Sequence, residues 1–141
     1  MTRIDPFSLA SPQRVTEVIT VSDPSNPDVK LTCEFAALDM VQYNYSEELA
    51  MQFIKKYILD ELPFPGEPFK LSRPLIATAC STYVMQVEGV YSVEEWLVIS
   101  YKMPRAWSDL IDKLTALTNR GPLGKVASVS QDTSGASSES Q

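Results

Sequence analysis

The sequence predicts an α+β fold in which an N-terminal β-hairpin is followed by a bundle of about four short α-helices and a disordered C-terminal tail. Two β-branched segments flank a turn-forming run, stretches with helical apolar spacing follow, and the chain ends in Ser and Gly. At 141 residues, the chain has room for one domain with a hydrophobic core. We expect a flexible N-terminal arm (1–13), a single hairpin-plus-helical domain (14–120) and a disordered Ser/Gly-rich tail (121–141).

The composition is that of a globular protein, with 44% hydrophobic and 21% charged residues. The net charge of −6 opposes approach to a phosphate backbone, and the largest basic cluster is the pair Lys55 and Lys56. We therefore expect no nucleic acid partner. Residues 1–12 contain no apolar core of a signal peptide, and the uncharged run 74–87 is too short to cross a bilayer, so no membrane segment is expected either.

The arm is predicted to be irregular because Pro6 and Pro12 interrupt any pattern, while Phe7 and Leu9 are available to pack on a neighbour. The pattern then predicts two strands, at residues 14–22 and 29–38. The residues between them are dense in turn formers and predict a loop of about six residues. Since an isolated hairpin is marginal in water, its apolar face needs helices, further strands or another subunit.

Asp39 and Gln42 offer a start for the first helix, whose apolar rows continue to about Leu59. Three prolines and a glycine in residues 60–69 predict a semi-rigid loop. Ser72 can cap a second helix, which carries Pro74 in its first turn. We expect that helix to end with Gly89 at the C′ position.

Ser92 and Glu95 form the pattern of a capping box, with Tyr91 and Trp96 spaced as a hydrophobic staple. Pro104 breaks or kinks the helix that follows, and we favour two helices at 93–102 and 105–119. The second of these presents an apolar stripe, and on its other face Asp109 and Lys113 are spaced to pair. The stripe consists of Trp107, Leu110, Ile111, Leu114 and Leu117. Gly121 is expected in the left-handed C′ conformation.

The sequence contains few of the residue patterns that enzymes use for catalysis. There is no histidine, which removes the commonest general base and most zinc sites. Cys33 and Cys80 have no companion at metal-ligand spacing and are interpreted as buried small hydrophobes. Each acidic pair has an ordinary place at a helix start, in a loop or on a solvated face. We predict no catalytic, metal-binding or cofactor-binding residue, and no enzymatic activity.

The helices carry more apolar side chains than one small core is expected to hide, and the surplus predicts a binding surface. It would serve self-association or a helical client, and some of its members should be incompletely buried. The predicted partner-binding residues are Trp96, Trp107, Leu110, Ile111 and Leu114.

Two segments carry a family resemblance: VKLTCEFAALDMVQYNYSEE, residues 29–48, and YSVEEWLVISYKMPRAWSDLIDKL, residues 91–114. In pattern, residues 14–120 resemble the tail assembly chaperones of long-tailed bacteriophages. The resemblance implies a non-enzymatic protein in the cytoplasm of the infected bacterial host. Such a protein oligomerises around the tape measure protein, shields its hydrophobic helices and recruits tail tube protein.

The family often makes a longer form by ribosomal frameshifting, and Gly124 followed by Lys125 is a dipeptide that a slippery codon pair would encode. The proline-rich loop at 60–69 departs from the family pattern, so we do not assign the family's binding residues to positions in this chain. The alternative hypothesis is a structural virion component, a neck or tail adaptor, that oligomerises through its N-terminal arm and hairpin.

Overall fold

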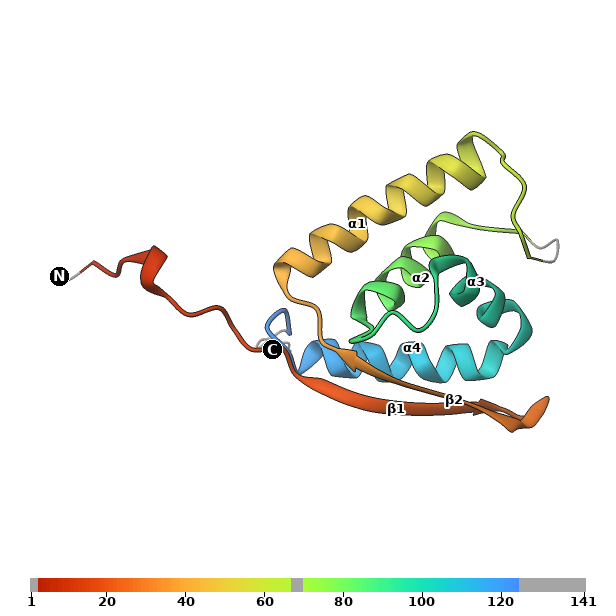
Figure 1. The fold of residues 1–141 in the computed structure, drawn as a ribbon, viewed down its shortest axis with the longest axis horizontal. Helices are drawn as coiled ribbons and strands as arrows, with labels where there is room; N and C mark the ends of the chain where they lie inside the picture. Colours follow the sequence, from red (N-terminus) through yellow and green to blue (C-terminus); the bar gives the residue numbers. More distant parts are fainter. Residues whose placement is uncertain (1–2, 67–69, 125–141) are drawn as a thin grey trace, which may run out of the picture.

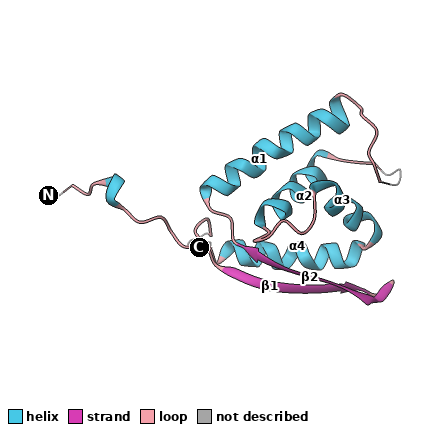
Figure 2. Ribbon diagram, viewed as in Figure 1, coloured by secondary structure: helices cyan, strands magenta, loops and turns pink. Residues whose placement is uncertain are grey.

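A computed structural model describes residues 3–66 and 70–124, and it has the predicted α+β fold (Figures 1 and 2). An antiparallel two-stranded hairpin lies against one helix, and three further helices stack beyond it (Figure 1). The elements are η1 (Pro6–Ser8), β1 (Thr16–Asp23), β2 (Asn26–Ala36), α1 (Met40–Ile54), η2 (Lys55–Leu59), α2 (Arg73–Met85), α3 (Val93–Lys102) and α4 (Pro104–Asn119). The sequence predicts a disordered tail at residues 121–141, and the part of it after Gly124 lies outside the residues that the structure describes.

The hairpin is longer and its turn tighter than the sequence suggested. The strands pair in one register from Thr16 opposite Ala36 to Ser22 opposite Lys30, and after a register shift Asp23 lies opposite Asn26. The predicted six-residue loop is therefore wrong, because only two residues lie between the strands. Asp23 makes the tight turn possible: its Oδ1 accepts hydrogen bonds from the Ser25 backbone N–H at 3.0 Å and the Ser25 hydroxyl at 2.6 Å.

The core lies between the inner face of the hairpin and the helices. Alternate strand residues such as Ile19, Val21 and Leu31 are buried, as the period of two along a strand requires. α4 packs against β1, and its leucines join the same buried cluster as the strand residues. α3 packs against α4, α2 against α3, and α1 against α2 (Figure 1).

The first two helices start where predicted, and the first helical stretch ends at Leu59 as predicted, but the second helix ends earlier than expected. Asp39 accepts a hydrogen bond from the Gln42 N–H at 2.8 Å and so caps α1, which continues into a single π-helical turn, η2. α2 begins after Ser72 as expected. It ends at Met85, so the prediction that Gly89 is its C′ residue is wrong. The chain leaves the helix because Val87 donates its N–H to the Glu34 carbonyl, at the outer edge of β2.

The capping box of α3 is confirmed in both directions, with the Glu95 N–H 3.1 Å from the Ser92 hydroxyl and the Ser92 N–H 2.9 Å from the Glu95 carboxylate. α3 and α4 are separate helices that meet at Met103, whose φ of −131° and ψ of 63° are not helical. Gly121 does not adopt the predicted left-handed conformation, because no described glycine has a positive φ. No helix in the described residues is long and apolar enough to span a membrane.

Candidate partner-binding site

The structure separates the five predicted partner-binding residues into two groups. Trp96, Leu110 and Leu114 are buried in the core, whereas Trp107 and Ile111 are half-buried. Trp96 has 0% of its surface exposed, and its ring contacts a set of aromatic neighbours. The centroid distances are 5.0 Å to Tyr91, 6.1 Å to Phe35 and 6.1 Å to Trp107. In this conformation Trp96 stabilises the fold and cannot touch a partner.

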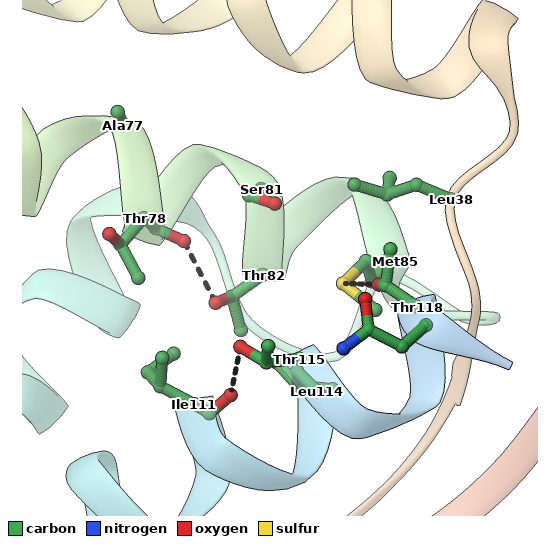
Figure 3. A pocket seen from close by; sticks show the side chains of 11 residues that line it. Leu38, Ala77, Thr78, Ser81, Thr82, Met85, Ile111, Leu114, Thr115 and Thr118 are labelled. Carbon is green, nitrogen blue, oxygen red and sulfur yellow. Dashed lines mark hydrogen bonds between the residues drawn. The ribbon is translucent and has the colours of Figure 1, made fainter. Parts of the chain in front are cut away.

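Two stripe residues, Ile111 and Leu114, line a groove between α2 and α4 that sequence reasoning did not identify (Figure 3). We call it the α2–α4 groove, and its volume is about 340 Å³. It is lined by Leu38, Ala77, Thr78, Ser81, Thr82, Met85, Ile111, Leu114, Thr115, Thr118 and Asn119. The groove exists because α2 and α4 each pack against α3 but not closely against each other.

Several residues with hydroxyl side chains line the groove, but most of these hydroxyls already donate hydrogen bonds within their own helices. The hydroxyls of Thr78, Thr82 and Thr115 donate to the carbonyl oxygens of Pro74, Thr78 and Ile111, four residues earlier in the same helix, each at 2.9 Å (Figure 3). These hydroxyl hydrogens are used inside the protein and do not require a hydrogen bond from a bound group. None of the eleven lining residues is charged. The groove therefore suits apolar side chains.

A sequence signal for this groove exists on α2. After Arg73 the helix carries no charged residue, and small side chains at Ala77, Thr78 and Ser81 recur on the face beside its buried stripe. Small residues at helical spacing leave room between helices, since they fill less volume than the leucines of α4. Only the tertiary arrangement shows that this room is left open rather than closed by a neighbouring helix.

α1 exposes a second apolar surface. Only Ser46 and Ala50 of this helix are buried, although most of its residues are apolar or aromatic. The large side chains of Met40, Val41 and Met51 are each more than half exposed. Several exposed apolar side chains on one helix favour a contact that buries them. α1 is covered on one side by α2.

Away from the turn at Asp23, the pKa shifts of ionisable groups are explained by burial and by contacts within the fold. The Tyr57 hydroxyl donates to the Glu94 carboxylate at 2.8 Å and joins η2 to the first turn of α3. Burial, together with this hydrogen bond and the Glu94 charge, raises the pKa of Tyr57 to about 12. Burial and the charge of Glu94 raise the pKa of Cys80 to about 12, so its thiol is protonated and unreactive at neutral pH.

Cys33 is likewise buried as a free thiol, and burial raises its pKa. Within residues 3–66 and 70–124, no three His, Cys, Asp or Glu side chains are placed to hold a metal ion. The α2–α4 groove and the exposed face of α1 are thus the described features best suited to binding. No family model, curated protein or solved structure matches this chain.

Proposed function

We propose that this protein is a non-enzymatic tail assembly chaperone of a long-tailed bacteriophage, acting in the cytoplasm of the infected host. It binds apolar helices of the tape measure protein and brings them to tail tube protein. The observation that carries the proposal is the uncharged, apolar α2–α4 groove on a chain of net charge −6. The acidic charge favours solubility, while the groove offers a site for apolar side chains of a client helix.

The proposed binding mode places one face of a client helix along the groove, with apolar anchors at i and i+4 between α2 and α4. A volume of about 340 Å³ is enough for one or two large side chains, so the contact would be local and repeated along a long client. The exposed methionines of α1, Met40 and Met51, would add an adaptable apolar contact because methionine side chains are flexible and polarizable. Such a surface suits a client with many similar helices.

The test is co-expression with the candidate tape measure protein, followed by pull-down and by measurement of soluble client. Thr115→Glu places a charge in the groove at an exposed position, so the fold should survive. Ala116→Glu adds the same charge to the same helix outside the groove. We expect Thr115→Glu to lose the client and Ala116→Glu to retain it. Equal client recovery with both folded variants would exclude the groove as the binding site.

The alternative, a structural neck or tail adaptor, is favoured by one observation, the exposed apolar side chains of the N-terminal arm. An arm of this kind is suited to contacting a neighbouring subunit in a particle. Fractionation separates the two hypotheses. A chaperone should be found with the tape measure protein and be missing from finished particles, whereas an adaptor should be present in them in stoichiometric amount.

A further inference from the structure

The N-terminal arm is locally ordered and carries apolar side chains that its own body does not cover. Asp5 accepts a hydrogen bond from the Phe7 N–H at 3.1 Å and caps the short η1 turn. Phe7 is 98% exposed, and Ile4 and Leu9 are each more than half exposed. Figure 1 shows the arm extending away from the hairpin and the helices. Three large apolar side chains on one short projecting segment favour a contact in which they are buried.

The arm leaves the body beside one end of the α2–α4 groove. The Arg14 side chain donates to the carbonyls of Ala37 at 2.7 Å and Ala36 at 3.2 Å, which holds the base of the arm against the end of β2. The next residue, Leu38, lines the groove, together with Asn119 at the end of α4. The arm and the groove are thus close at the base, but the arm runs outward from α2 and α4 (Figure 1).

The arm and the groove are matched in chemistry and size. From Pro6 to Leu9 the arm has no charged residue, and neither has the groove lining, while Asp5 just before this stretch is engaged in capping the η1 turn. Along α2 the lining runs from Ala77 to Met85, a helical rise of about 12 Å. The arm from Ile4 to Leu9 spans at most about 17 Å when extended, and less with its helical turn. A groove of about 340 Å³ can take the Phe7 ring.

We propose that the arm of one protomer docks in the α2–α4 groove of a second copy, with Phe7 as its anchor. Because the base of the arm and the mouth of the groove lie at the same end of the molecule, a two-fold axis near that end allows both arms to be exchanged reciprocally. The outward course of the arm favours the partner's groove over its own. This inference goes beyond the proposed function, since it requires neither a client nor a particle. The arm and a client helix would use the same groove, so client binding would require the arm to be displaced.

The first test measures the mass of the purified full-length chain over a range of concentrations by light scattering and sedimentation. We expect a concentration-dependent dimer. Phe7→Asp and Thr115→Glu should each weaken association about tenfold or more, because they remove or block the burial of a large apolar side chain. Two matched controls, Ser11→Asp in the arm and Ala116→Glu on α4, should dimerise like the unchanged chain. Circular dichroism verifies that all four variants are folded.

The second test mixes the two weakened variants. Phe7→Asp retains an intact groove and Thr115→Glu retains an intact arm, so an arm-to-groove contact predicts mixed dimers when neither variant dimerises alone. A chain that stays monomeric at high concentration would overturn the proposal, and would be the result if the arm folds into its own groove. Undiminished dimers of either variant, or variants that fail to associate on mixing, would also overturn it. No client is present, so these results do not depend on the proposed function.

Discussion

At the scale of single residues, Asp23 connects two parts of the chain that are distant in sequence. One carboxylate oxygen organises the hairpin turn through Ser25, and the other accepts the backbone N–H groups of Arg105 at 2.8 Å and Ala106 at 3.1 Å. Residue 103, the N-cap of α4, supplies no side-chain hydrogen bond. Asp23 therefore caps α4 from the tip of the hairpin and satisfies donors that the helix start leaves unpaired.

We predict that Asp23→Asn lowers the midpoint of urea unfolding at pH 7, because an amide has only one acceptor oxygen to replace two. The hydrogen bonds, led by those from Ser25, lower the pKa of Asp23 from 3.8 to about 2. Since the folded pKa is depressed, the stabilisation is fully present above the unfolded value and is lost as the pH falls toward 2. Asp28→Asn is the matched control. An Asp23→Asn deficit that persists undiminished near pH 2 would contradict this account.

Gly121 is required by close packing rather than by backbone conformation. A Cβ atom at this position would lie near the Cβ of the buried Ala37, and the two positions cannot both carry a side chain without a shift. We expect Gly121→Ala to destabilise the protein by about 1–3 kcal/mol, as overpacking typically does. The double variant Gly121→Ala with Ala37→Gly should recover part of this loss. Additive losses in chemical denaturation would show that the two positions do not share the space.

At the scale of elements, α3 begins with both reciprocal hydrogen bonds of its capping box and with the Tyr91 ring against Trp96. Ser92→Ala should cost about 0.5–2 kcal/mol of unfolding free energy, because it leaves the Glu95 N–H without its acceptor. Chemical denaturation measures the loss. Thr115→Ala, a substitution at an exposed position within α4, serves as the control and should change stability less. Equal effects of the two substitutions would mean that the cap contributes no special stabilisation.

The helices also show how one apolar stripe can serve two purposes. On α4, Leu110, Leu114 and Leu117 are buried in the core, while the half-buried Ile111 lies in the groove, where one side of Leu114 also forms part of the lining. Neighbouring residues on a helix differ by about 100° in direction, so a broad stripe reaches beyond the area that one packing partner covers. The sequence predicts the width of the apolar stripe, but it does not show which stripe residues pack in the core and which line the groove.

At the scale of the whole molecule, the apolar residues of the described chain form one continuous buried cluster that includes the hairpin and all four α-helices. This agrees with the expectation that the marginal hairpin needs helices to cover its apolar face. Among the described residues, the apolar features that this assembly leaves at the surface include the arm, the outer side of α1 and the α2–α4 groove.

We expect that residues 125–141 are not needed for folding, because the composition of this stretch is poor in large apolar side chains. A chain ending at Gly124 should keep the thermal midpoint of the full-length protein, as measured by circular dichroism. The shorter chain ending at Ala36, which lacks every α-helix, is the contrasting control and should not fold. A fall of many degrees for the chain ending at Gly124 would show that the tail contributes to the stability of the body.

The sequence by itself determined the α+β class, the antiparallel hairpin, the starts of α1, α2 and α3, and the break before α4, whose predicted start at Arg105 is one residue after the observed start at Pro104. These features depend on local signals: caps at Asp39, Ser72 and Ser92, and a proline at residue 104 whose missing N–H cannot continue a helix. Local chemistry acts over a few residues, so it can be read along the chain.

Only the tertiary structure decided the features that depend on distant contacts. Asp23 forms hydrogen bonds both within the hairpin turn and to the start of α4. The chain after α2 forms a hydrogen bond to the edge of β2. Gly121 packs closely against Ala37. The same holds for the candidate site, since Trp96, Leu110 and Leu114 are buried and Ile111 lies in a groove with residues of α2. Burial depends on which element covers a given face, and that is set by packing across the whole chain rather than by the spacing of apolar residues within one helix.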